Sequence, residues 1–233
     1  MRSFFLVAAV LLTSARIPAS NVEAVVHGLE ARYKSAKTLK AVFFESYSDG
    51  HGGTSAESGT VYFSRPGRMR WDYESPEEKL FLVDGTNVWL YVPADRTASR
   101  AKMKESSDWR TPLALLVGKA DLTKLCRELQ IVRMPSENGD SGQQSDSAGT
   151  ALRCIPRDAP TGDTSQQVLI EINPQDYLAR VVIHDEGGIT TEFRFGNWQE
   201  NVPLPESMFH FEPPPGVSIV DEESLLGEIR QKQ

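Results

Sequence analysis

Cysteine, histidine and positive charge are scarce in this chain, and each scarcity excludes a class of protein. Its 233 residues contain two Cys and four His, with no Cys-x-x-Cys and no His-Glu-x-x-His motif, so the usual zinc sites lack their ligands. Lys and Arg number 25 against 32 Asp and Glu, which gives a net charge of −7. A nucleic-acid-binding protein would need a clustered basic face. We therefore expect no metal, no cofactor and no nucleic-acid partner.

Catalytic motifs are missing as well. The sequence has neither a Gly-x-Ser-x-Gly nor a Walker motif. Asp185 and Glu186 follow His184, but neighbouring residues of a strand point to opposite faces, so adjacency is weak evidence for a site. We expect no catalytic residue and no enzymatic activity. The four His are scattered along the chain, at His27, His51, His184 and His210.

Long apolar runs are also lacking, and the one short run lies at the N-terminus. Phe4–Leu12 is apolar throughout and follows a positive start at Arg2. As a helix it would span about 14 Å, roughly half of the 30 Å hydrocarbon core of a bilayer. The pattern predicts a secretory signal over residues 1–20, with cleavage between residues 15 and 24. Removing residues 1–20 takes away two Arg and no acid, which changes the net charge from −7 to −9. We expect an exported, soluble, periplasmic protein.

The two cysteines, Cys126 and Cys154, fit an exported protein. Between them, residues 136–149 are rich in Ser, Gly and Asp and predict a flexible hairpin loop, flanked by strand candidates at 125–132 and 150–155. If these strands pair antiparallel, the two Cys lie almost opposite each other and can form a disulfide. Two buried free thiols are the alternative.

The remaining pattern is mostly that of strands. Residues 21–34 have apolar side chains at helical spacing and predict a first helix, and residues 109–117 predict a short second one. Residues 39–46 carry apolar side chains on both faces, which indicates a strand covered on both sides. About ten consecutive strands with few helices predict a mainly β (α+β) fold, built as one curved sheet or an incomplete barrel. The other strand candidates are residues 59–73, 80–83, 88–92, 97–103, 167–172, 178–185, 189–195 and 209–211.

The alternation is clearest in Gly59–Tyr73. One face of this tract is apolar and aromatic, the other polar and basic, and Pro66-Gly67 bends or divides it. An aromatic face can be a packed core or the lining of a cavity, and the sequence leaves both open. The apolar face carries Val61, Phe63, Met69 and Trp71.

Four segments of the chain occur in the order known from one protein family. They contain Gly59, Phe63, Arg65-Pro66 and Arg70-Trp71-Asp72-Tyr73; then Val83-Asp84-Gly85, Trp89 and Tyr91-Val92-Pro93; then Thr111–Leu116; and finally Phe209-His210-Phe211 with Pro213-Pro214 and Gly216-Val217. Together they resemble the LolA family, the periplasmic carriers of outer-membrane lipoproteins. The similarity runs from about Asn21 to Val220.

The resemblance implies an open, incomplete antiparallel β-barrel with a helical lid enclosing an apolar cavity. It implies a carrier domain over residues 21–220 and leaves 221–233 as a polar tail. Members of the family bind the acyl chains of lipoproteins and carry them from an ABC-type release complex of the inner membrane to an outer-membrane receptor or membrane, without catalysing a reaction. The residues expected to line the cavity are Val61, Phe63, Met69, Trp71, Leu82, Trp89, Leu90 and Phe193, with the parity at Trp89 and Leu90 left open.

The resemblance also implies a way to close the lid. Arg65, the Arg of the Arg-Pro pair, would hold the lid shut against Leu113, Leu115 and Leu116. The chain departs from the family at Met69, where an aromatic residue is usual, and in its Cys pair and 136–149 loop. The alternative function is a periplasmic sensor or regulatory domain that binds a lipid or lipoprotein. Proteins of that kind usually carry an additional domain, for which 233 residues leave little room.

Overall fold

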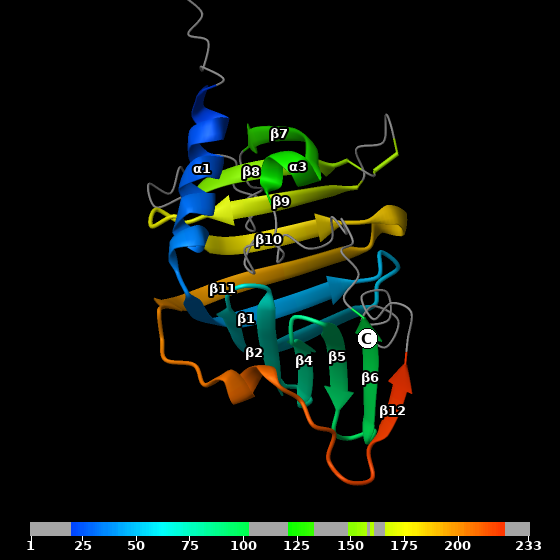
Figure 1. The fold of residues 1–233 in the computed structure, drawn as a ribbon. Helices are drawn as coiled ribbons and strands as arrows, with labels where there is room; N and C mark the ends of the chain where they lie inside the picture. The colour runs from blue at the N-terminus through cyan, green and yellow to red at the C-terminus, as the bar shows by residue number, and fades with distance from the viewer. Residues whose placement is uncertain (1–19, 103–120, 133–148, 158, 161–165, 222–233) are drawn as a thin grey trace, which may run out of the picture.

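Figure 1 shows the computed structural model of the chain, which describes residues 20–102, 121–132, 149–157, 159–160 and 166–221. The expected signal, the helix at 109–117, most of the 136–149 loop and nearly all of the tail lie outside these residues. The elements, in chain order, are α1 (Ser20–Ser35), β1 (Thr38–Ser48), β2 (Thr54–Ser64), β3 (Arg68–Ser75), β4 (Lys79–Val83), β5 (Asn87–Val92), β6 (Thr97–Lys102), α3 (Leu122–Leu125), β7 (Cys126–Val132), β8 (Thr150–Pro156), β9 (Gln167–Ile172), β10 (Leu178–His184), η1 (Glu186–Gly188), β11 (Thr190–Glu200), η2 (Glu206–Phe209) and β12 (Ser218–Asp221).

The twelve strands of the described residues belong to one sheet, in the order β12-β6-β5-β4-β3-β2-β1-β11-β10-β9-β8-β7. Neighbouring strands are antiparallel except β12, which runs parallel to β6. The strands at the two ends of the sheet run in clearly different directions, because the sheet twists and curls as it is extended (Figure 1). The sheet stays open, with β12 at one edge and β7 at the other. The expected mainly β fold with an open antiparallel sheet is confirmed.

Helix α1 lies against one face of this sheet, which we call the inner face. Its apolar residues Val26, Leu29 and Tyr33 are buried and belong to the same core cluster as side chains from β1, β2, β3 and β8 to β11. Glu23 in the first turn and Arg32 and Lys34 in the last turn complement the helix dipole. In Figure 1, α1 crosses β8 to β10 and leads directly into β1. No described helix is both long enough and apolar enough to cross a membrane.

Two expectations about individual elements need correction. The face of β1 opposite α1, the outer face, is not covered by the described residues, because Val42 and Phe44 remain 41% and 44% exposed. Residues 209–211 do not form a strand, since the chain makes the short 3-10 helix η2 at Glu206–Phe209 instead. The segment just before η2, residues 202–205, contains two Pro, and Pro cannot donate to a sheet ladder.

Candidate functional site: the aromatic inner face

The tract Gly59–Tyr73 folds as two paired strands with its apolar face inward. In the β2–β3 register, Val61 faces Trp71 and Phe63 faces Met69. All four side chains are at most 6% exposed. The alternation continues unbroken because the turn at residues 65–67 joins Ser64 and Arg68 as partners and so keeps the odd positions on one face.

Trp71 is the centre of a cluster of aromatic rings on this face. Its ring centroid lies 4.7 Å from that of Phe43, 5.7 Å from Phe193, 6.0 Å from Phe195 and 6.3 Å from Phe63, each in an edge-to-face arrangement. The rings come from β1, β2, β3 and β11, so the cluster crosses the middle of the sheet. Phe193, expected from the sequence to line the cavity, therefore lies beside Trp71.

Gly59 allows the cluster to extend along β3. It stands between Phe43 and Tyr73 in the sheet register, and a Cβ atom at this position would lie 1.9 Å from the backbone oxygen of Asp72. Only glycine fits such a close approach. The rings of Phe43 and Tyr73 meet over this gap, with centroids 5.0 Å apart.

Leu82 and Trp89 do not belong to the inner face, and the sequence-based prediction is wrong for both. Leu82 pairs with Arg70 across β3 and β4 and with Trp89 across β4 and β5. Because side chains alternate along a strand, these three residues lie on the outer face, opposite Trp71. There Leu82 and Trp89 pack with Leu80 and Phe209 in a separate cluster, under the chain segment 204–211. Leu90 packs against the main core, so the open parity is decided in favour of Leu90.

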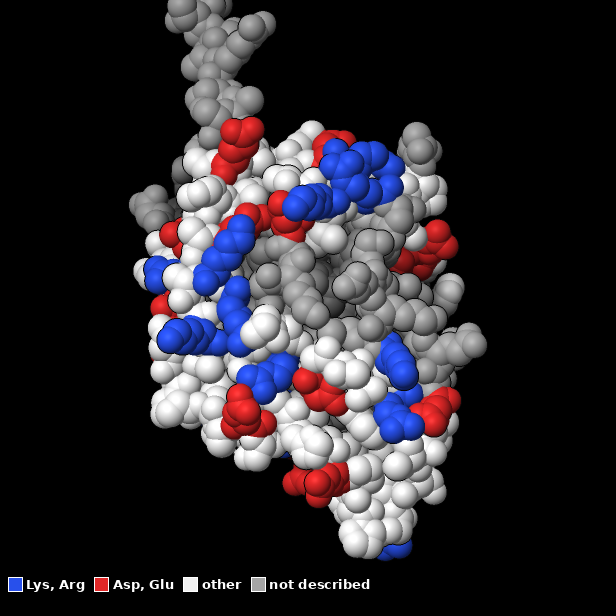
Figure 2. Space-filling view, viewed as in Figure 1, with Lys and Arg blue, Asp and Glu red and all other residues white. Residues whose placement is uncertain are grey.

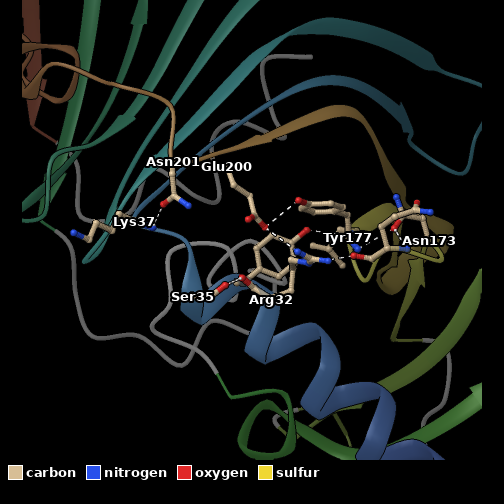
Figure 3. A network of polar contacts seen from close by, with 10 residues as sticks. Arg32, Ser35, Lys37, Asn173, Tyr177, Glu200 and Asn201 are labelled. Carbon is tan, nitrogen blue, oxygen red and sulfur yellow. Dashed lines mark hydrogen bonds and ion pairs between the residues drawn. The ribbon is translucent and has the colours of Figure 1, made fainter.

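A polar network closes the inner face at the end where α1 meets the sheet (Figure 3). Glu200 accepts from the Tyr177 hydroxyl at 2.9 Å and pairs with Arg32 at 3.4 Å. The Arg32 guanidinium lies over the Tyr177 ring, 4.8 Å from its centroid, and donates to the Gln175 carbonyl at 3.1 Å. These contacts tie the last turn of α1 to β11 and to the turn before β10.

The deepest of these contacts is made by Tyr33 of α1. Its hydroxyl, buried among Tyr177 and Trp198, accepts from the Leu178 backbone N–H at 2.8 Å. Trp198 donates in turn to the Leu178 carbonyl at 2.8 Å. Burial raises the pKa of Tyr33 well above its usual value, so the hydroxyl stays protonated.

A second polar cluster closes the inner face at the opposite end, near the β1–β2 hairpin. Glu45 and Glu57 face each other across β1 and β2, and both are buried. Tyr73 donates to Glu45 at 2.9 Å, while Lys79 pairs with Glu57 and lies over the Tyr73 ring, 4.9 Å from its centroid. Burial, and then the charge of Glu45, raise the pKa of the Tyr73 hydroxyl, which keeps it a donor. The aromatic face is thus bounded by polar groups at both ends.

Arg65 lies at the turn between β2 and β3. Its backbone N–H donates to the Lys37 carbonyl at 3.0 Å, just after α1. Burial lowers the pKa of its guanidinium, and the interaction with Tyr33 acts in the opposite direction. Arg65 is therefore close to the junction of α1 and β1. Its predicted lid partners Leu113, Leu115 and Leu116 lie outside the described residues, so the role of Arg65 in closing a lid stays a prediction.

The structure joins Cys126 and Cys154 as a disulfide, with Cα atoms 5.4 Å apart. The two residues are diagonal and not directly opposite, because Cys126 faces Pro156 while Cys154 faces Leu129. A register shift between Cys126 and Glu128 brings them within bonding distance. The bond links the two strands at the free edge of the sheet.

Charged residues are mixed on the surface seen in Figure 2. Lys and Arg follow α1 and gather again near the end of β6, with Asp and Glu among them. Within the described ranges, no three His, Cys, Asp or Glu side chains come together as a metal site would require. The apolar inner face is consequently the feature of this molecule that most needs a functional explanation.

An open antiparallel sheet that curves around an aromatic inner face and one helix defines a class of β-sheet binding proteins with an apolar interior. The family described as "Outer membrane lipoprotein carrier protein LolA" matches residues 34–212. The chain belongs to this LolA family, as the sequence resemblance indicates.

Individual relatives agree with this assignment. The chain is 28% identical over 198 residues to an outer-membrane lipoprotein carrier protein of Nitrosospira multiformis, covering 84% of this chain and 88% of the relative. It is 34% identical over 165 residues to the protein of that name from Bordetella avium, covering 71% of each. A conserved protein of Thermus thermophilus shares the fold, with a TM-score of 0.50 at 13% identity over 86% of this chain and 98% of that one.

Proposed function

We propose that this protein binds the acyl chains of lipoproteins against its inner face and carries them through the periplasm. In this proposal it receives them from an ABC-type release complex of the inner membrane and delivers them to an outer-membrane receptor or membrane. The ligand is moved without a chemical step. The observation that carries the proposal is the aromatic face around Trp71, which spans strands from both halves of one open sheet.

The size of the hydrophobic effect explains why such a face is needed. Each CH₂ group of an acyl chain contributes about 0.8 kcal/mol when it is buried. A chain of roughly 15 carbons would therefore cost on the order of 12 kcal/mol to expose to water, and a lipoprotein has more than one chain. A carrier must shield the whole acyl chain from water, and it must also be able to release the chain. An open sheet meets both requirements better than a closed barrel with a fixed diameter.

The proposal is tested by co-expressing the full chain with a bacterial lipoprotein and purifying the complex from the periplasm. We expect the acylated lipoprotein to co-purify, and the same lipoprotein with its lipid-bearing Cys replaced by Ser to be absent. Leu90→Glu puts a charge on the partly buried inner face and should abolish the complex. Phe44→Glu puts the same charge on the exposed outer face and is the matched control, which should bind normally.

Two outcomes would contradict the proposal. One is recovery of the unacylated lipoprotein in the same amount as the acylated one, which would mean that the polypeptide and not the lipid is recognised. The other is equal binding by both variants, because the inner face would then have no part in the contact. Circular dichroism of each variant establishes that it is folded before the result is used.

A further inference from the structure

Trp71 has a buried hydrogen-bond donor that finds no acceptor among the described residues. The side chain is 2% exposed, and its indole Nε1–H finds no hydrogen-bond partner in the part of the chain that the structure describes. The other two described Trp residues differ: Trp198 donates to the Leu178 carbonyl at 2.8 Å and Trp89 to Asp84 at 3.2 Å. Buried polar groups are nearly always paired in native proteins, so an orphan donor in the middle of the core calls for an explanation.

The described neighbours of Trp71 offer its indole N–H only weak acceptors. Four aromatic rings pack around the indole with centroids between 4.7 and 6.3 Å away. Its strand neighbours in register, Val61 and Phe81, are apolar as well. The face of an aromatic ring can accept an N–H, but such contacts are weaker than a hydrogen bond to a carbonyl oxygen. Among the described aromatic residues of the inner face, Trp71 is therefore the one whose polar atom has nothing of equal strength to receive it.

We propose that the Trp71 Nε1–H donates a hydrogen bond to an ester carbonyl oxygen of the bound acyl chain. This inference rests on the proposed function and names the group that the inner face recognises. An acyl chain is apolar except at its carbonyl, which has acceptors and no donors. The Trp71 Nε1–H, a buried donor surrounded by apolar side chains of the inner face, complements such a ligand. Trp71 then fixes how deep the chain enters and selects ester-linked chains over ether-linked ones.

The test compares two ligands that differ only in their ester carbonyls. One is a diacylglyceryl-cysteine peptide with two medium-length ester-linked chains and a free amino terminus, and the other is its ether-linked analogue. Binding of both to the full chain is measured by displacement of a fluorescent fatty acid. We expect the wild type to bind the ester ligand about fivefold more tightly, the typical net effect of one hydrogen bond. Trp71→Phe should bind the two ligands equally.

Trp198→Phe is the matched control. It removes an indole of the same aromatic cluster whose Nε1–H already has a partner, so the preference for the ester should remain. In the wild type, the Trp71 Nε1–H resonance should move downfield in NMR spectra on addition of the ester ligand and not of the ether ligand. This measurement decides the question even if Trp71→Phe does not fold.

The outcomes separate this inference from the proposed function. If neither ligand binds the wild type, the carrier function itself fails. If both bind equally to the wild type, or if Trp71→Phe keeps the preference, the protein still binds acyl chains but Trp71 does not read their carbonyl. If Trp71→Phe keeps the preference while weakening both ligands by the same factor, Trp71 contributes packing only. Equal binding by the wild type and a preference that survives in Trp71→Phe each overturn the inference and leave the proposed function standing.

Discussion

At the scale of single residues, the buried pair of Tyr73 and Glu45 makes a testable contribution to stability. Tyr73→Phe removes the hydroxyl that donates to Glu45 at 2.9 Å and changes little else. A hydrogen bond to a charged, buried group contributes about 2 kcal/mol. We expect the free energy of unfolding, measured by urea denaturation, to fall by about that amount.

Tyr47→Phe is the control for this prediction. Tyr47 lies two positions after Glu45 in the same strand and is only partly buried. Loss of its hydroxyl should change the free energy of unfolding by less than about 0.5 kcal/mol. Equal effects of the two substitutions would show that Glu45 is held in place without Tyr73.

Residue positions on the inner face were predictable from the sequence only where one face was polar. Between Gly59 and Tyr73 the polar outer face marks Val61, Phe63, Met69 and Trp71 as inward. Strands β4 and β5 give no such signal, because the segment 204–211 covers their outer face and both faces are apolar. That is why Leu82 is wrongly predicted to face inward and why the parity at Trp89 and Leu90 stays open in the sequence. A missing hydrogen-bond partner, as at Trp71, leaves no trace in a sequence.

At the scale of elements, helix α1 depends on Tyr33 for its attachment to the sheet. Tyr33→Phe removes the acceptor of the Leu178 N–H and leaves this buried donor unpaired, at a cost of about 1 to 3 kcal/mol. We expect hydrogen exchange within α1 to become faster than in β1, because the helix can then open without the sheet.

Lys34→Gln serves for comparison with Tyr33→Phe. Lys34 is in the same helix but exposed, and its pair with Glu30 is a surface contact four residues apart, which contributes at most about 0.5 kcal/mol. Its exchange pattern should match that of the wild type. If Tyr33→Phe exchanges at the wild-type rate as well, the Arg32, Tyr177 and Glu200 contacts alone are enough to hold the helix.

The disulfide stabilises one edge of the sheet, which is formed by β7 and β8. Cys126 and Cys154 are 28 positions apart, and a closed loop of this length contributes about 3 to 4 kcal/mol on the chain-entropy account. In the double variant Cys126→Ala/Cys154→Ala, the free energy of unfolding, measured by thermal denaturation, should fall by that amount. Hydrogen exchange should increase in β7 and β8 and stay unchanged in β1 and β2.

A reductant tests the same bond without a substitution. It should destabilise the wild type and have no effect on the double variant. Without reductant, a thiol-labelling reagent should find no free thiol in the unfolded wild type. Labelling of two thiols would mean that the pair is reduced in the protein as isolated.

At the scale of the whole molecule, the two faces of the sheet differ in what packs against them. The inner face is continuous across β1, β2, β3 and β11 and has α1 against it. The outer face carries a buried apolar cluster over β4 and β5, where the segment 204–211 packs on Leu80, Leu82 and Trp89. The sequence predicts the mainly β fold because strand alternation and turns are local. The segment 204–211 covers the outer face through contacts between parts of the chain that are more than a hundred positions apart. One of them is the hydrogen bond from Arg70 to the Met208 carbonyl at 3.0 Å. No local sequence pattern predicts such a contact.

Which face holds the acyl chains can be measured with the tryptophans. Trp71 belongs to the inner face and Trp89 to the outer cluster. A lipopeptide with brominated acyl chains quenches indoles that it contacts, so saturating amounts should quench the wild type strongly. Trp89→Phe should keep this quenching, whereas Trp71→Phe should lose a large part of it. The reverse pattern would place the acyl chains under the segment 204–211, and the sheet would then carry its cargo on the outer face, with the aromatic cluster around Trp71 acting only as the core that holds the sheet together.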